Sequence, residues 1–207
     1  MSRAGWSSLA GERLRFEMLI YLHGFNSSPG SHKAQMLGRH MIERGLGEQY
    51  WCPALPVAGE RAVAAVEAAL ARHPRDSITL VGSSLGGFYA TYLAERHDLR
   101  AVLINPAVHP HHDLRAYLGV QRNLFTQEQY VLTEDHLRQW AALYLPAVHP
   151  QRYLLLVETG DEVLDYRVAV EKYRGARQIV VAGGDHSFAS FPEHIPLILE
   201  FAGLARA

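Results

Sequence analysis

The sequence predicts an α/β fold in which a mainly parallel sheet lies between two layers of helices. Short apolar runs alternate along the chain with segments whose apolar residues recur at helical spacing. Runs that are apolar at every position are typical of strands buried on both faces, and such strands belong to parallel sheets. Apolar residues make up 48% of the 207-residue chain, enough for a core that needs no disulfide or metal.

The predicted strands and helices alternate in chain order. We expect strands at 18–22, 78–81, 101–104, 153–157 and 178–181, with a further short strand in 51–55. Helical faces are expected around Ala34, Leu37 and Met41; around Val63, Val66 and Leu70; over 85–96; and around Ile195, Ile198, Leu199 and Ala202. Alternation of this kind produces right-handed crossovers and a doubly wound sheet.

One domain is expected over residues 18–207, preceded by an N-terminal tail. Residues 1–17 contain charged residues, glycine and serine but no continuous or periodic run of apolar residues. We therefore expect a disordered or loosely docked tail and not a signal peptide. Residues 106–150 interrupt the alternation, because they are rich in histidine and proline and show short helical patterns without a strand. We expect them to form an insertion or cap over one end of the sheet.

Charge and cysteine content narrow the classes of partner and compartment. Lys and Arg total 20 against 21 Asp and Glu, with no long run of either sign, so we expect neither nucleic acid nor an anionic membrane as partner. No stretch approaches the ~18 apolar residues of a membrane span. The single cysteine, Cys52, fits a reducing compartment, and we expect a cytoplasmic protein that acts on a small molecule. Its oligomeric state is not readable.

A nucleophile elbow is predicted directly after the strand at 78–81. The segment Gly82-Ser83-Ser84-Leu85-Gly86-Gly87 matches G-x-S-x-G and leads into a helical pattern, the context in which this motif operates. Gly82 and Gly86 would make room for a crowded turn that exposes Ser84 at a helix N-terminus. The pattern alone is weak, and a glycine- and serine-rich turn without chemistry is the alternative.

Two backbone N–H groups are candidates for an oxyanion hole. His23-Gly24-Phe25-Asn26 follows the first strand, where this architecture supplies an oxyanion donor from a loop. Phe25 is the expected donor there, beside the N–H of Leu85 after the candidate nucleophile. The alternative is that His23 and Gly24 only shape a tight turn.

An acid and a base are expected at the ends of the last two strands. Asp161 follows 153–157 and His186 follows 178–181, which gives the chain order nucleophile, acid, base. A serine needs a neutral imidazole to take its proton, and the imidazole needs a carboxylate to orient it. Asp165 and Glu158 are weaker alternatives for the acid, since Asp165 precedes a helical pattern as an N-cap would and Glu158 lies at the strand edge.

Four segments resemble the YqiA-like esterases, a small bacterial group of α/β hydrolases. They are Tyr21-Leu22-His23-Gly24-Phe25-Asn26-Ser27-Ser28-Pro29, Gly82-Ser83-Ser84-Leu85-Gly86-Gly87, Ile104-Asn105-Pro106-Ala107 and Gly184-Asp185-His186-Ser187-Phe188. The resemblance implies a three-layer α/β-hydrolase fold lacking the first strands of larger members, and an ester or thioester hydrolase without metal or cofactor. It implies Ser84 as nucleophile, His186 as base, Asp161 as acid, and Phe25 and Leu85 as oxyanion donors. Residues 1–17 have no counterpart in it.

Two rival interpretations come from other features. His109-Pro110-His111-His112-Asp113 nearly matches a zinc-ligand motif of metallo-hydrolases, but Leu114 replaces its last histidine, and a solvated loop is the simpler interpretation. The fold also hosts non-catalytic ligand-binding or interaction proteins, which commonly lose a triad member. The substrate is not readable. Large side chains in the insertion either line an acyl pocket or pack onto the sheet: Tyr117, Leu118, Leu124, Phe125, Tyr130, Trp140 and Tyr144.

Overall fold

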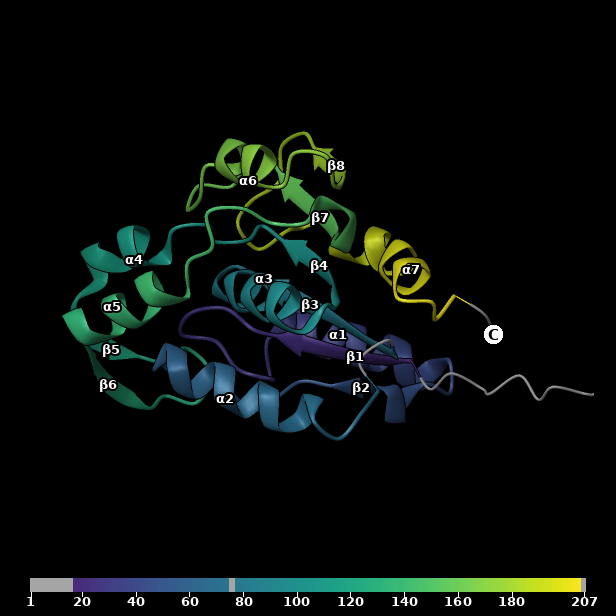
Figure 1. Cartoon of the computed structure of the whole chain (residues 1–207), viewed down its shortest axis with the longest axis horizontal. Helices are drawn as coiled ribbons and strands as arrows, with labels where there is room; N and C mark the ends of the chain where they lie inside the picture. Colours follow the sequence, from purple (N-terminus) through teal and green to yellow (C-terminus); the bar gives the residue numbers. More distant parts are fainter. Residues whose placement is uncertain (1–16, 75–76, 206–207) are drawn as a thin grey trace, which may run out of the picture.

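The computed structural model describes residues 17–74 and 77–205, which are built around a six-stranded sheet (Figure 1). The strands are β1 (Met18–Leu22), β2 (Tyr50–Trp51), β3 (Ile78–Ser83), β4 (Arg100–Ile104), β7 (Tyr153–Glu158) and β8 (Arg177–Val181). Their order is β2-β1-β3-β4-β7-β8, and every neighbouring pair is parallel. The predicted α/β fold with a mainly parallel sheet is confirmed.

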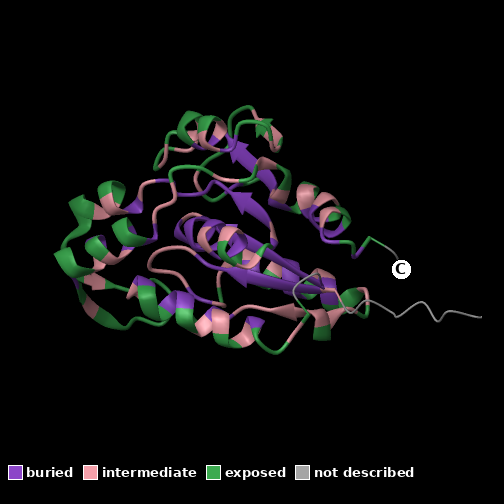
Figure 2. Ribbon diagram, viewed as in Figure 1, coloured by how far each residue is buried: buried purple, intermediate pink, exposed green. Residues whose placement is uncertain are grey.

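Strand ends differ from the expected ranges by small amounts, with one larger exception. The strand expected over 51–55 is reduced to Tyr50–Trp51. Pro53 has no N–H with which to continue a ladder, so pairing with β1 stops before it. The central strands are buried along their whole length (Figure 2), as continuous apolar runs predict.

Helices cover both faces of the sheet. On one face lie α2 (Gly59–Leu70), α3 (Leu85–His97) and α6 (Tyr166–Lys172), and on the other α1 (His32–Glu43) and α7 (Phe191–Phe201). A hydrophobic cluster lies between the sheet and the helices on each face. Because side chains alternate along β1, Ile20 belongs to the cluster under α2, α3 and α6, and Leu19 and Tyr21 belong to the cluster under α1 and α7. The two clusters fix the sheet from both sides, so the carboxyl ends of its strands form a firm edge.

Residues 106–150, the cap segment, gather at the end toward which the strand arrows point (Figure 1). The segment contains α4 (Pro110–Asp113), the 3-10 turn η3 (Leu114–Tyr117), β5 (Gly119–Arg122), β6 (Gln129–Leu132) and α5 (Glu134–Leu143). Two further 3-10 turns, η1 (Gly47–Gln49) and η4 (Pro150–Arg152), precede β2 and β7.

The expectation that the cap segment holds no strand is wrong. β5 and β6 pair as an antiparallel hairpin, with Val120 opposite Val131 and Gln121 opposite Tyr130. Each strand has four residues, and the two valines are 74% and 55% exposed. Strands this short with glutamine on them lack the continuous apolar run by which buried strands are found.

The remaining expectations concern the N-terminal tail and membrane-spanning helices. The predicted tail lies outside the described residues except for Glu17, whose carboxylate is 3.7 Å from the guanidinium of Arg100. Among residues 17–74 and 77–205, no helix has both the length and the hydropathy required to cross a bilayer.

Candidate active site

Ser84 lies in the turn between β3 and α3, in a backbone conformation that few non-glycine residues adopt. Its φ is 54° and its ψ is −123°. The turn is held from outside, because the Ser84 N–H donates to the Ile104 carbonyl at 3.1 Å and the Ser84 carbonyl accepts from Ala107 at 3.0 Å. Such a conformation persists only where its surroundings over-determine it.

Glycine is required on both sides of this turn. A Cβ on Gly82 would collide with the carbonyl of Gly86, and a Cβ on Gly86 would collide with the carbonyl of Leu22. The crowding expected from the G-x-S-x-G pattern is therefore backbone against backbone, within the elbow at Gly82 and between the elbow and the end of β1 at Gly86.

Ser84, His186 and Asp161 come together from three strand ends. The Ser84 Oγ is 3.1 Å from the His186 Nε2, and the His186 Nδ1 is 2.8 Å from the Asp161 Oδ2. The Asp161 side chain is 1% exposed and the His186 side chain 22%. A carboxylate has no proton to donate, so Nδ1 carries the proton and Nε2 is free to accept from the serine.

The Asp161 carboxylate is oriented by its own loop. Its Oδ1 accepts from the backbone N–H groups of Val163 at 2.9 Å and Leu164 at 2.8 Å. Burial by itself would raise the pKa of Asp161, but the hydrogen bonds from His186 and Leu164 outweigh burial and lower it. Asp165 instead caps α6, where its side chain accepts from the Arg167 N–H at 3.0 Å.

The β1 loop, residues 23–28, lies beside Ser84. A Cβ on Gly24 would stand 3.1 Å from the Ser84 Cβ, so the loop approaches as closely as a glycine allows. Neither the Phe25 N–H nor the Leu85 N–H donates to a protein acceptor in the part of the chain that the structure describes. Both remain available to a ligand at Ser84.

His23 is the buried first residue of this loop, and both of its ring nitrogens lie against backbone groups. Its Nε2 accepts from the Leu55 N–H at 3.1 Å and its Nδ1 lies 3.1 Å from the Gly24 carbonyl. Burial lowers the pKa of His23, which keeps the ring neutral and able to accept that bond. The His23 ring thus supports the β1 loop through backbone contacts.

Glu158 and Asn105 hold the histidine loop, residues 183–190, and sequence reasoning gave neither of them this role. The buried Glu158 carboxylate accepts from the N–H groups of Asp185 at 2.8 Å, Ala189 at 3.0 Å and Ser190 at 2.9 Å, and from the Ser190 hydroxyl at 2.6 Å. The Asn105 Nδ2 donates to the Asp185 carbonyl at 3.0 Å, and its Oδ1 accepts from the Glu158 N–H at 3.0 Å. The signal available was their position at the carboxyl edge of the sheet, since Glu158 is the last residue of β7 and Asn105 directly follows β4.

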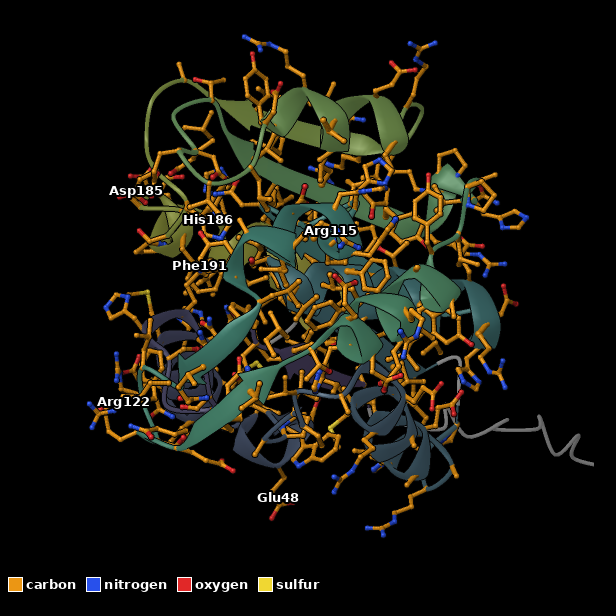
Figure 3. All side chains as sticks on the ribbon, turned by 90° about the vertical axis from the view of Figure 1, so that its left-hand side faces the viewer. Glu48, Arg115, Arg122, Asp185, His186 and Phe191 are labelled. Carbon is orange, nitrogen blue, oxygen red and sulfur yellow. The ribbon has the colours of Figure 1, made fainter. Side chains whose placement is uncertain are left out.

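A pocket of about 520 Å³ opens at the serine and the histidine. Leu124 and Phe125, at the tip of the β5–β6 hairpin, form part of its wall, and Phe188 and Phe191 lie on the histidine side. Figure 3 looks onto this end of the molecule, with His186 beside Phe191. Lys33 also lines the pocket and donates to the Ser187 carbonyl at 2.6 Å.

The other large side chains of the cap segment do not line this pocket. Trp140 is fully buried in the core and donates to the Tyr89 hydroxyl at 2.7 Å. The rings of Tyr117 and Tyr130 pack against Phe25. Leu118 is 36% exposed, and the Tyr144 ring lies 5.0 Å from that of His109. Of the large side chains in the cap segment, Leu124 and Phe125 therefore line the pocket at Ser84, whereas Trp140 belongs to the core.

The histidine cluster of the cap segment is helical, not the loop that we expected. His109 precedes α4, and the rings of His111 and His112 on that helix have centroids 4.2 Å apart. Pro at the first helical position favours this turn. Within residues 17–74 and 77–205, no group of three or more His, Cys, Asp or Glu side chains has an arrangement that could hold a metal ion.

The sheet order, the helical layers and the elbow at Ser84 define an α/β-hydrolase fold. Solved structures agree: mouse α/β hydrolase domain-containing protein 10 aligns with a TM-score of 0.68 and 16% identity over 89% of each chain. A monoacylglycerol lipase of Paleococcus ferrophilus aligns with a TM-score of 0.64 and 16% identity, over 93% of this chain and 96% of that one. Est1E of Butyrivibrio proteoclasticus, solved with ferulic acid bound, aligns at 0.63 and 13%, over 90% and 86%.

The chain belongs to the family described as "Uncharacterised protein family (UPF0227)", whose model matches residues 18–203. A UPF0227 protein of Pectobacterium carotovorum is 26% identical over 190 residues, which cover 90% of this chain and 99% of that protein. The UPF0227 protein YcfP of Salmonella arizonae is 25% identical over 190 residues, with the same coverage. This is the YcfP/YqiA family, so the resemblance found in the sequence is confirmed.

The Glu158 carboxylate should be a pH-dependent source of stability. Burial alone would raise the pKa of Glu158, but hydrogen bonds from Ser190, Asp185 and Ala189 outweigh burial and lower it. A lowered pKa stabilises the fold above the ordinary glutamate value and loses that contribution as the pH falls through the folded value. Every group around the carboxylate is a donor, so Glu158→Gln should reduce the free energy of unfolding by about 2–4 kcal/mol at pH 7.

Urea unfolding of wild type and Glu158→Gln from pH 7 to pH 3.5 measures the difference in their free energies of unfolding. The difference should stay constant at neutral pH and shrink below about pH 4.3, where glutamate in an unfolded chain gains its proton. Thr91→Val is the matched control, because it removes a buried bond between two neutral groups, Thr91 and Tyr173. A Glu158→Gln difference as independent of pH as that of the control would contradict the assignment.

Proposed function

We propose that this protein is a serine hydrolase that cleaves carboxylic ester or thioester bonds through an acyl-enzyme on Ser84. The observation that carries the proposal is the chain of hydrogen bonds from the Ser84 Oγ through His186 to Asp161, with heavy-atom distances of 3.1 Å and 2.8 Å. Serine, imidazole and carboxylate in this order form the arrangement that activates a hydroxyl toward a carbonyl.

In the acylation step, the Ser84 Oγ attacks the ester carbonyl while the His186 Nε2 takes the hydroxyl proton. The N–H groups of Phe25 and Leu85 would hold the oxyanion of the tetrahedral intermediate, helped by the positive end of α3. His186 then gives the proton to the leaving alcohol or thiol, which departs and leaves the acyl group on Ser84.

Deacylation repeats the sequence with water in place of the alcohol. His186 takes a proton from the water as it attacks the acyl-enzyme, and returns that proton to the Ser84 Oγ as the acid leaves. Throughout, Asp161 would stabilise the imidazolium and keep the proton on Nδ1. Its lowered pKa favours the ionised form that this role needs.

The pocket favours an acyl or aromatic acid portion of modest size. The pocket has a volume of about 520 Å³, and phenylalanine and leucine side chains line it together with Ser84. Two relatives in fold support ester substrates: Est1E was solved with ferulic acid, and the Paleococcus protein is a monoacylglycerol lipase. A panel of acyl esters and acyl thioesters graded by chain length would choose between the two bond types.

Replacing the nucleophile should abolish turnover and leave the fold intact. Ser84→Ala should lower kcat by at least ~10³-fold, because only binding and oxyanion stabilisation remain. A fluorophosphonate should label wild type at Ser84, as peptide mass spectrometry would show, and should not label the variant. Ser83→Ala is the neighbouring control and should keep both labelling and most of the activity. Unlabelled, inactive wild-type protein would instead indicate a non-catalytic member of the fold.

The rate should depend on pH in the direction set by a histidine base. A protonated imidazole cannot accept the serine proton, so kcat/KM should fall toward acid pH as the base gains a proton. Asp161 is not expected to limit the acid side, since its pKa is lowered. Initial rates across a constant-ionic-strength buffer series measure this, and a rate that is flat from about pH 5 to 8 would argue against a histidine base.

Two aspartates on one loop should give opposite phenotypes. Asp161→Asn should lower kcat by up to ~10⁴-fold with little change in melting temperature, because the amide favours the wrong tautomer of His186. Asp165→Ala should cost about 1 kcal/mol of stability and little rate, because it removes the cap of α6. Steady-state kinetics and thermal unfolding of the two variants decide the matter. If Asp165→Ala lost activity and Asp161→Asn lost only stability, Asp165 would be assigned as the catalytic acid in place of Asp161.

A further inference from the structure

The β1 loop is tied to the cap segment. The Asn26 carbonyl accepts from the Leu124 N–H at 3.0 Å, and the Ser27 carbonyl accepts from the Asn123 Nδ2 at 2.8 Å. Both donors belong to the turn that joins β5 to β6. The loop residues next to Phe25 are therefore held from the side opposite the sheet.

The Asn26 side chain makes a second connection to the same hairpin. Its Oδ1 accepts from the Tyr130 hydroxyl at 2.6 Å, and its Nδ2 donates to the Gln121 Oε1 at 3.2 Å. Gln121 and Tyr130 are direct partners in the β5–β6 register, and both are half-buried while Val120 and Val131 are exposed. The inner face of the hairpin thus offers one donor and one acceptor, which match the two ends of an amide.

The Phe25 side chain completes the attachment. Its ring contacts Tyr117, Tyr130 and Trp140 edge to face, with centroid distances of 6.0, 6.5 and 6.5 Å. These partners come from η3, β6 and α5, so the ring is enclosed by three elements of the cap segment. The residue whose N–H is a candidate oxyanion donor is anchored outside the sheet by its own side chain.

We infer that the β5–β6 hairpin braces the β1 loop and so positions the Phe25 N–H for the oxyanion, with Asn26 and Tyr130 as positioning residues. The inference rests on the proposed function. Leu124 and Phe125 at the hairpin tip line the pocket at Ser84. One element thereby contacts the acyl portion and holds an oxyanion donor, which links recognition of substrate to stabilisation of the transition state.

The electrostatics of the brace suit a permanent contact. Burial raises the pKa of Tyr130 to about 12, so its hydroxyl remains a donor to Asn26 across the working pH range. Asn26 has a φ of 51°, in the left-handed region that asparagine tolerates better than most residues. The backbone there is held in place by these side-chain bonds.

Tyr130→Phe tests the inference by removing one hydroxyl and keeping the ring against Phe25. We expect kcat to fall about tenfold with KM within about twofold, because displacing a catalytic group by about 1 Å can cost up to ~10²-fold. Tyr117→Phe is the matched control: its ring also contacts Phe25, but its hydroxyl has no hydrogen-bond partner within the described residues. That control should keep both constants.

Amide hydrogen exchange gives a readout that needs no turnover. In Tyr130→Phe the Leu124 N–H, bonded to Asn26, should exchange faster, whereas the Asn123 N–H, bonded to Glu128 inside the hairpin, should not change. An unchanged kcat in Tyr130→Phe, or an equal loss in Tyr117→Phe, would overturn the inference. Wild-type protein that neither hydrolyses esters nor is labelled would overturn the proposed function. In that case the exchange rate of the Leu124 amide would still test whether the hairpin braces the β1 loop. Equal Leu124 exchange rates in Tyr130→Phe and Tyr117→Phe would overturn the inference.

Discussion

The backbone of Ser84 is the constraint around which the rest of the site is arranged. A φ of 54° at a residue with a side chain costs roughly 1–3 kcal/mol. This backbone conformation is maintained because the neighbouring strands pack against the turn from both sides. The elbow is closed by two hydrogen bonds, from the Ser84 N–H to the Ile104 carbonyl at the end of β4 and from the Ala107 N–H to the Ser84 carbonyl, and by contact with the end of β1. Parallel pairing of β1, β3 and β4 places all three strand ends at one edge, so a single strained turn sets where the neighbouring loops must pass.

Two loops meet at this turn, and they are held by different parts of the molecule. The histidine loop is anchored to the sheet, through the buried Glu158 at the end of β7 and Asn105 after β4. The β1 loop is anchored to the cap segment, through Asn26 and the ring of Phe25. His186 is therefore held by the buried core of the sheet. The Phe25 N–H, the candidate oxyanion donor, is instead held by a small hairpin whose outer face is exposed.

Sequence patterns predicted the parts of this structure that depend on continuous signals. Long apolar runs identified the central strands, and the elbow motif with its flanking elements located Ser84. The chain order predicted an acid at Asp161 and a base at His186 after the last two strands, and the structure brings these two side chains together at Ser84. The β5–β6 hairpin was missed because its strands are short and bury one face only. Glu158 was weighed as an acid, since a carboxylate that accepts only backbone and hydroxyl donors looks, in sequence, like any other carboxylate at a strand end.

The choice of asparagine at position 26 connects these observations. A glycine there would satisfy the left-handed φ at less conformational strain, so the backbone alone does not account for a residue with a side chain. What glycine lacks is an amide that can accept from Tyr130 and donate to Gln121 at once. The alternation of β5 and β6 turns these two partners to the same face, because they are opposite each other in the ladder. The hairpin and the β1 loop are thus complementary in both hydrogen bonding and register.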